Sequence, residues 1–273
     1  MKAATAIGIG LGFAGLMMGA IMEGTSPMAF FNIPALIIVL GGTAGATMAT
    51  CGMEAMKALP SLYKKAFSPE PIDARARVDL LVGLSEKARR EGLLALEEDI
   101  DSLEDEFSRK GMQLVVDGVD PELVREIMEN EIDGMAARHH NCAKPFEKAG
   151  GFAPTMGIIG TVMGLVHVLG NLSQPNTLGP AISGAFIATL YGVGSANVIF
   201  LPIAGRLQGL SHEEVELRTL TVEGVLAIQA GDNPRVVADK LAAFLAPGEG
   251  AGEGEGAEVR QMPDADDAAA VAA

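Results

Sequence analysis

The chain has 273 residues, of which 49% are hydrophobic, and it carries a formal net charge of −15. Four stretches rich in glycine, alanine and leucine contain almost no charge, and the segments between and after them hold nearly all of it. A soluble domain would interleave apolar and charged residues, so this segregation indicates membrane spans. The acidic balance, without a basic face or a cluster of stacking aromatics, argues against nucleic-acid binding.

Four apolar segments are long enough to cross a membrane as helices. They are Ala4–Met22, Phe30–Cys51, Phe152–Leu172 and Pro180–Ile203. Each has roughly 19–24 residues, and about 20 suffice to cross ~30 Å of hydrocarbon. The first segment is expected to be an anchor rather than a signal peptide, because a second span follows after a short loop.

The basic residues predict the orientation of these spans. The short loops Glu23–Ala29 and Ser173–Gly179 contain no Lys or Arg, and all 20 basic residues lie before the first span, between the second and third, or after the fourth. By the positive-inside rule, both termini and residues 52–151 are cytoplasmic. Cys51 ends a span and Cys142 falls in this reducing compartment, so neither a disulfide nor a metal site is expected.

The expected fold class is all-α, a polytopic membrane protein with four transmembrane helices and a helical cytoplasmic domain. The expected units are residues 1–51 (transmembrane helices 1 and 2), 52–151 (cytoplasmic helical domain), 152–203 (transmembrane helices 3 and 4), 204–246 (cytoplasmic C-terminal helices) and 247–273 (a disordered acidic tail). The tail is predicted to be disordered because it is almost entirely Gly, Glu, Asp and Ala, with few large apolar residues.

Apolar residues at three- and four-residue steps predict the cytoplasmic helices. The predicted helices are Glu54–Ala66 continuing out of the second span, Ile72–Arg90, Leu93–Lys110, a helix opened by Asp120-Pro121 and running toward the third span, Ala204–Ala230, and Val236–Leu245. Asp120 is the expected N-cap and Pro121 the first helical residue.

The four spans contain no Asp, Glu, Lys or Arg, and their titratable candidates are His167 and Tyr191. Ion relays through lipid normally need an ionisable group that faces a cavity. If this chain conducts ions, another subunit must bring the carboxylate. His167 is expected to be hydrogen-bonded near the outer end of its helix rather than to act as a relay.

Two threonines and two prolines are the remaining candidates within the third and fourth spans. Thr161 and Thr189 either bond the carbonyl one turn back or line a polar path that touches a cation. Pro154 and Pro202 each remove a backbone donor and can leave a carbonyl free or bend a helix. The alternative for Pro154 is a helix start, and for Pro202 a terminal kink without functional consequence.

Several segments together resemble bacterial flagellar stator subunits of the MotA/PomA family, within the MotA/TolQ/ExbB superfamily. The matching segments are Phe152–Val166, Leu178–Pro180 and Phe186–Gly192 in the last two spans, Gly41–Thr43 in the second span, and Ala88–Glu98, which looks like the family's rotor-facing motif. The resemblance covers residues 1 to about 245, and the combination is far more specific than any one segment.

The resemblance implies an assembly and a location. It implies a homopentamer of this chain around a dimer of a MotB/PomB-type subunit, which carries a membrane Asp and a peptidoglycan-binding domain. The implied location is the bacterial cytoplasmic (inner) membrane, where ion flow past that Asp drives rotation of the ring. No enzymatic activity, cofactor or metal is expected.

The resemblance also assigns roles to eight residues. Pro154 and Pro202 match functional prolines of the ion pathway, and Thr161 with Thr189 resembles sodium-driven members. The rotor-binding positions, which meet charges on a switch protein of the FliG type, are Arg89, Arg90, Glu97 and Glu98. Sodium needs oxygen ligands, so the added hydroxyl favours Na⁺ as the transported cation, with H⁺ as the alternative.

Other function classes fit the sequence less well. ExbB/TolQ-type energisers have three spans with the long cytoplasmic segment after the first, whereas two spans precede that segment here. A small-solute transporter is disfavoured by the lack of intramembrane charge and of substrate-binding half-helices. A membrane enzyme would need a nucleophile elbow, phosphate loop or metal-ligand cluster, and none is present. A passive helical scaffold remains the least specific alternative.

Overall fold

The structure is a computed structural model that describes residues 4–69, 71–173 and 175–245. These described residues form helices and connecting turns, without a strand. Four helices are long and apolar enough to cross a membrane: Ala4–Met22, Ile33–Phe67, Pro121–Gly170 and Leu178–Gln229. The predicted all-α class with four spans is therefore confirmed. The predicted acidic tail, residues 247–273, lies outside the described residues.

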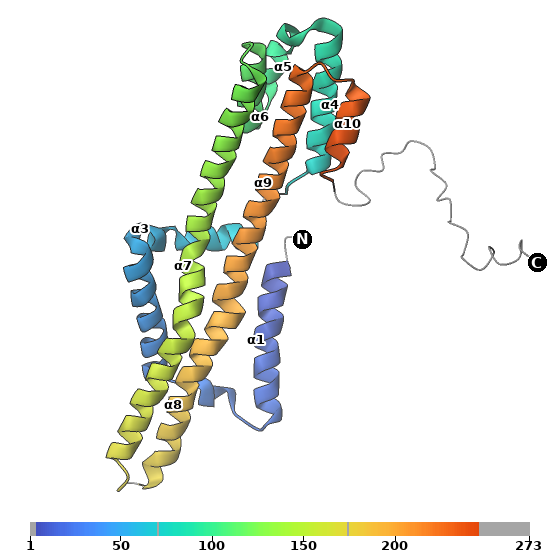
Figure 1. Ribbon diagram of the computed structural model, residues 1–273. Helices are drawn as coiled ribbons and strands as arrows, with labels where there is room; N and C mark the ends of the chain where they lie inside the picture. Colours follow the sequence, from blue (N-terminus) through green and yellow to red (C-terminus); the bar gives the residue numbers. More distant parts are fainter. Residues whose placement is uncertain (1–3, 70, 174, 246–273) are drawn as a thin grey trace, which may run out of the picture.

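The helices follow one another in a simple order (Figure 1). They are α1 (Ala4–Met22), η1 (Pro27–Phe30), α2 (Ile33–Leu36), η2 (Ile37–Gly41), α3 (Gly42–Phe67), α4 (Ala74–Glu91), η3 (Leu93–Leu96), α5 (Glu97–Ser102), α6 (Glu106–Val116), α7 (Pro121–Gly170), α8 (Pro175–Ser195), η4 (Ala196–Phe200), α9 (Leu201–Gln229) and α10 (Pro234–Ala242). The segments η1 and η3 are 3₁₀ turns, and η2 and η4 are π-helical turns.

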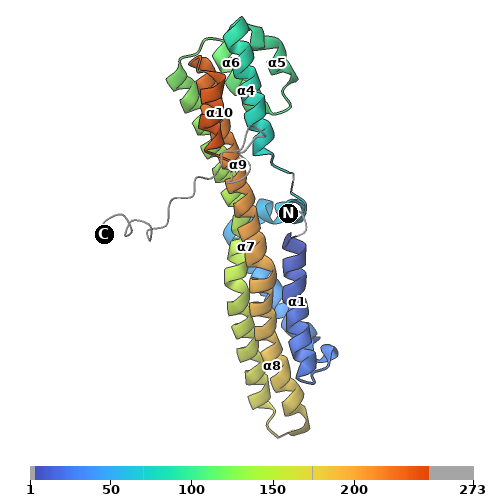
Figure 2. The ribbon, with the colours of Figure 1, turned by 90° about the vertical axis from the view of Figure 1, so that its right-hand side faces the viewer.

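Two long rods run from the membrane part into the charged part of the chain, here called the cytoplasmic domain after its predicted location. One is the 50-residue helix α7, and the other is the unbroken helical run α8–η4–α9 (Figures 1 and 2). As predicted, Asp120 caps α7: its side chain accepts a hydrogen bond of 3.0 Å from the Glu122 amide. Both rods pass through the expected unit boundaries without a break, so the same two helices belong to the membrane part and to the charged domain beyond it.

The predicted helix over Glu54–Ala66, continuing out of the second span, is present as the second half of α3, but a sharp bend separates it from the span. Gly52 has φ +83° and ψ 168°, a conformation that side chains rarely adopt, and it bends α3 there. The following residues 53–67, here called the interfacial helix, lie across the bundle (Figure 1). Tyr63 packs edge-on against Phe146 of α7, with 5.0 Å between ring centroids.

The prediction of a single helix over Leu93–Lys110 is wrong, because this segment is divided into η3, α5 and α6. Leu103 is extended between α5 and α6, and the Asp105 side chain caps α6 by accepting from the Ser108 amide at 2.9 Å. The predicted apolar face nevertheless points inward: Leu96, Ile100 and Phe107 belong to the core shared by α4, α6, α7, α9 and α10. The helical periodicity thus predicted which side chains are buried, but it did not predict the capped breaks between the helices.

Asp105 also holds Arg77 of α4, which joins the start of α4 to α6. Burial opposes ionisation of this carboxyl, but hydrogen bonds from Ser108 and Arg77 outweigh burial and hold the pKa of Asp105 below its usual value of 3.8. A lowered folded-state pKa stabilises the fold above pH 3.8, and this contribution is lost as the pH falls below that value.

Replacing Asp105 is expected to destabilise the cytoplasmic domain. Asp105→Ala removes the cap and the ion pair, and should cost about 1–2 kcal/mol of unfolding free energy at neutral pH. Asp105→Asn keeps a capping side chain and should lower the unfolding free energy less. The difference in unfolding free energy between this variant and wild type should narrow below pH 3.8. Thermal unfolding of the purified chain measures both. Asp101→Asn, at an exposed position of α5, is the control and should be neutral.

Candidate functional site

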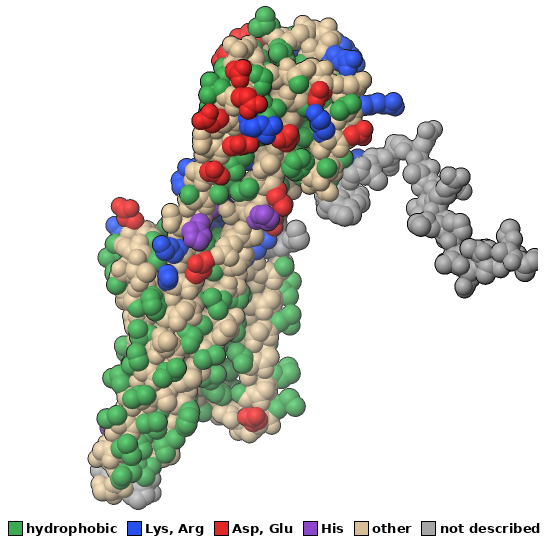
Figure 3. All heavy atoms as spheres, in the orientation of Figure 1, with side chains coloured by type: hydrophobic (Ala, Val, Ile, Leu, Met, Phe, Trp, Pro, Cys, Tyr) green, Lys and Arg blue, Asp and Glu red, His purple; other side chains and the backbone are tan. Residues whose placement is uncertain are grey.

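Charge is divided sharply along the molecule. Figure 3 shows Lys, Arg, Asp and Glu side chains gathered over the cytoplasmic domain, whereas the surface of the membrane half is largely apolar and nearly uncharged. Large hydrophobic side chains on the spans are exposed in the single chain, among them Phe13, Ile159 and Phe186. These faces require lipid or other protein subunits, and the spans themselves bring no carboxylate.

Helices α7 and α8 approach each other so closely that their backbones touch. A Cβ placed on Gly157 would lie 2.9 Å from the Ala188 carbonyl oxygen and 3.2 Å from the Gly192 Cα. A Cβ on Gly192 would lie 3.0 Å from the Gly157 Cα. Two turns further out, Gly164 meets Ala185 in the same way. Small residues are therefore required along this contact, as is common between membrane helices.

This close contact brings Thr161 and Thr189 together. The Thr161 Oγ1 lies 3.1 Å from the Gly157 carbonyl oxygen on its own helix and 3.0 Å from the Ala185 carbonyl oxygen on α8. It also shares a hydrogen bond with Thr189 Oγ1, which in turn lies 3.5 Å from the Gly157 carbonyl. Both side chains are partly buried. Two hydroxyls and two carbonyl oxygens thus form one cluster, with the ligand chemistry that hard cations prefer.

Both prolines lie inside long helical runs, where α7 packs against the run α8–η4–α9. A helix start at Pro154 is wrong, because α7 passes through it unbroken. A Cβ on Gly150, one turn before Pro154, would meet Leu201, the neighbour of Pro202, at 2.5 Å. Since proline has no amide hydrogen, the Gly150 carbonyl lacks its usual α-helical donor at this level. The π turn η4 ends directly before Leu201, and such turns are frequent at functional sites.

The two titratable candidates of the spans have different surroundings. Tyr191 donates a hydrogen bond to the Phe30 carbonyl and accepts one of 3.2 Å from the Asn32 amide, so it fastens the loop before α2 to α8. His167 is exposed, and its carbonyl accepts a hydrogen bond of 2.8 Å from the Asn171 side chain. The expected hydrogen bond to the His167 ring is not present within the described part of the chain.

Sequence reasoning missed two threonines of the second span. Thr43 and Thr47 are each only 2% exposed, and neither hydroxyl has a hydrogen-bond partner among the described residues. Buried hydroxyls without partners are unusual in folded proteins. The spacing of four residues places Thr43 and Thr47 on the same face of the span, which could have drawn attention to them. The spacing does not show that their hydroxyls lack hydrogen-bond partners.

The four charged candidates of the cytoplasmic domain lie around one turn. Arg89 and Arg90 end α4, and Glu97 and Glu98 begin α5, and all four are exposed. Gly92, with φ +89°, makes the turn between the two helices. Figures 1 and 2 place this turn at the end of the molecule farthest from the membrane spans. The surface thus presents cations and carboxylates side by side, and Arg90 also pairs with Glu86 at 3.4 Å on its own helix.

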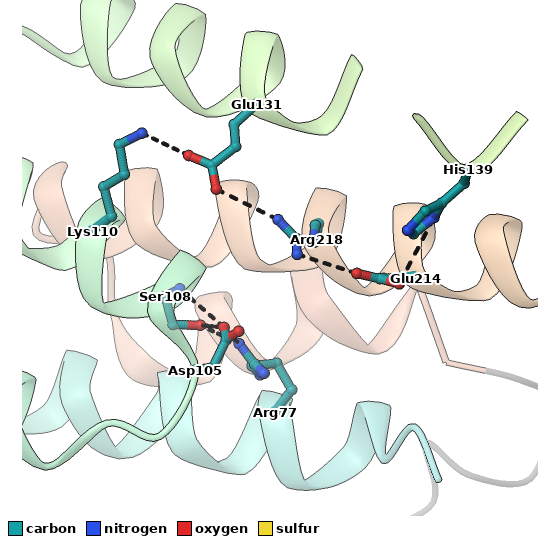
Figure 4. Close-up of polar contacts among 8 residues, drawn as sticks. All are labelled: Arg77, Asp105, Ser108, Lys110, Glu131, His139, Glu214 and Arg218. Atoms are coloured by element: carbon teal, nitrogen blue, oxygen red, sulfur yellow. Dashed lines mark hydrogen bonds and ion pairs between the residues drawn. The ribbon is translucent and has the colours of Figure 1, made fainter. Parts of the chain in front are cut away.

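Salt bridges fasten this end of the domain to both rods (Figure 4). Glu131 of α7 binds Lys110 of α6 at 2.6 Å and Arg218 of α9 at 3.6 Å. Arg218 also binds Glu214 at 3.1 Å, and its guanidinium lies 4.8 Å from the centre of the Phe107 ring. Single exposed pairs contribute little, but this network links three helices around a shared arginine.

The chain is similar to known proteins over most of its length. A family model described as the MotA/TolQ/ExbB proton channel family matches residues 99–219. Motility protein A of Borreliella burgdorferi is 38% identical over 247 residues, covering 90% of this chain and 95% of that protein. Motility protein A of Bacillus subtilis is 36% identical over 246 residues, covering 90% and 91%.

Two solved structures have the same fold. The structure of C. jejuni MotAB matches with a TM-score of 0.86 at 31% identity, covering 90% of this chain and 96% of that one. The flagellar MotAB stator complex from Bacillus subtilis matches with a TM-score of 0.84 at 36% identity, covering 89% and 96%.

The backbone contact between α7 and α8 predicts a strong asymmetry between two nearby glycines. Gly192→Ala places a methyl group into the backbone of α7, and should lower stability by about 1–3 kcal/mol or more. Gly194→Ala, two residues along the same helix, meets open space within the chain and should be tolerated. Thermal unfolding and the amount of chain recovered from membranes measure the effect. Equal behaviour of the two variants would contradict the close approach.

Proposed function

The chain belongs to the motility protein A family, and we propose that it is the torque-generating subunit of a flagellar stator, an ion channel that couples cation flow to rotation. The observation that carries this proposal is the combination of two features in one rigid body. An uncharged cluster of hydroxyl and carbonyl oxygens lies between α7 and α8, and the same rods extend unbroken into a charged cytoplasmic domain.

The channel is completed by a partner of the MotB/PomB type. Ion flow needs a titrating carboxylate, and the spans of this chain carry none. Five copies of the chain surround two copies of the partner, whose membrane Asp lies beside the oxygen cluster. The faces of the spans support such an assembly: α1 has no buried residue, and Gly8, Gly15 and Gly19 have open space beside them within the chain.

The assembly lies in the bacterial inner membrane with both termini and residues 52–151 in the cytoplasm. The distribution of Lys and Arg supports this orientation. Transported cations pass Thr161 and Thr189, and Pro154 and Pro202 leave backbone carbonyls without helical donors farther along the same rods, on the cytoplasmic side of the cluster. Each passage of a cation turns the ring of five chains around the fixed partner. The rotation is driven by ion flow and not by a covalent reaction.

The turn between α4 and α5 transmits torque to the rotor. Arg89, Arg90, Glu97 and Glu98 meet complementary charges on a rotor protein of the FliG type. Exposed charges orient a transient contact while contributing little affinity each. This suits a contact that must be made and released at every step.

Sodium is the favoured cation, because two hydroxyls and two carbonyls can replace part of its hydration shell. Thr161→Val removes one ligand without changing the volume much, and should reduce sodium-dependent swimming. Thr155→Val, which loses only a bond of 2.7 Å to the Phe152 carbonyl on its own helix, is the control. Swimming speed is measured across sodium concentrations. Motility that persists without sodium and collapses with an uncoupler would show that protons are the cation.

Charge reversal tests the rotor contact. Arg90→Glu and Glu98→Lys should each reduce swimming modestly, and together should act strongly in strains whose rotor contact is already weakened. Asp133→Lys, at an exposed position in the cytoplasmic half of α7, is the control for a change of charge alone. Swimming that is untouched by the double reversal in the weakened strains would refute the assignment.

A further inference from the structure

The interfacial helix, residues 53–67, carries a basic face. Lys57, Ser61, Lys64 and Lys65 are exposed and follow one another at helical spacing, whereas Tyr63 on the other side packs into the bundle. Lys64 and Lys65 have no ion-pair partner among the described residues, in a chain whose net charge is −15. A local surplus of positive charge therefore lies at the C-terminal end of this helix.

A cavity of about 530 Å³ lies beside these lysines, within the usual size range of ligand sites. Its polar lining includes Ser61, Lys64, Lys65, Arg77, Arg218 and Thr221. Asp105 and Glu214 also line it, and they are bonded to Arg77 and Arg218 (Figure 4). The charges of the two arginines are thereby compensated, which leaves the two lysines as uncompensated cations of the cavity.

The cavity reaches the cytoplasmic surface of the membrane. Arg206 is the first charged residue after the fourth span, and Leu210, at the wall of the cavity, follows it by four residues. Four helical residues rise about 6 Å, which is comparable to a headgroup layer of about 5–8 Å. The interfacial helix begins where the second span ends, at Gly52, and runs across the bundle at this level (Figure 1).

We propose that this cavity binds the phosphate group of an anionic phospholipid headgroup from the cytoplasmic leaflet. Lys64 and Lys65 supply the charge, since lysine binds phosphate as a point charge and juxtamembrane lysines attract anionic lipid. Pro71 and Ile72 line the cavity beside them and offer an apolar wall to the glycerol group. The bound lipid holds the C-terminal end of the interfacial helix against the membrane surface. This inference is independent of the transported cation and of the rotor contact.

The test titrates phosphatidylglycerol onto the purified full-length chain in detergent and counts bound lipid by native mass spectrometry. Phosphatidylcholine and soluble glycerol 3-phosphate are titrated in parallel. The double variant Lys64→Gln/Lys65→Gln should weaken phosphatidylglycerol binding about fivefold per lysine, or roughly 30-fold together. Lys57→Gln, on the same face but outside the cavity, is the matched control, and Lys64→Arg/Lys65→Arg should retain binding.

Each outcome decides the proposal. Selective loss of phosphatidylglycerol in the double variant, with Lys57→Gln unchanged and thermal unfolding of both variants intact, supports it. Full competition by glycerol 3-phosphate at equal concentration would support a phosphate site but overturn the lipid as its source. The proposal would be overturned if phosphatidylcholine bound equally well, or if Lys57→Gln lost phosphatidylglycerol binding to the same extent as the double variant. It would also be overturned if no probe bound, which is the result expected if another copy of the chain covers the cavity.

Discussion

The backbone contact between α7 and α8 is the constraint on which the rest of the structure depends. Gly157 and Gly192 leave no room for a Cβ between the two helices, so the rods are held at one distance and in one register. In lipid there is no general hydrophobic force between helices, and close packing of small residues takes its place. The same register brings Thr161 to Thr189, so the packing contact and the oxygen cluster share one origin.

Both rods extend this constraint beyond the membrane. Because α7 and the run α8–η4–α9 are continuous, the cytoplasmic core is built on the same two helices that pack in the bilayer. Glu131 and Arg218, one on each rod, are part of the network that fastens α6 to them. The prolines and η4 interrupt the regular hydrogen bonding of the rods at one level, which is where bending would cost least.

The division of charge has two consequences. The spans bring no carboxylate of their own, and their exposed apolar faces require lipid or other subunits. On the cytoplasmic side, carboxylates pair with many of the cations near the rods. Arg89 lies at the far tip without an ion pair among the described residues, and Arg90 beside it pairs with Glu86. Lys64 and Lys65, also without ion pairs there, lie at the C-terminal end of the interfacial helix.

The sequence by itself determined the spans, their number and the all-α class, because hydropathy over some 20 residues depends on composition and not on tertiary contacts. Helical periodicity also identified core residues such as Ile100 and Phe107, although the breaks between η3, α5 and α6 were missed. The tertiary structure alone decided where the chain bends and which side chains meet. Gly52 is one of many glycines in the spans, and only its φ of +83° shows that it turns the chain. Thr161 and Thr189 are 28 residues apart, and their contact follows from the register of two helices, which no local pattern encodes.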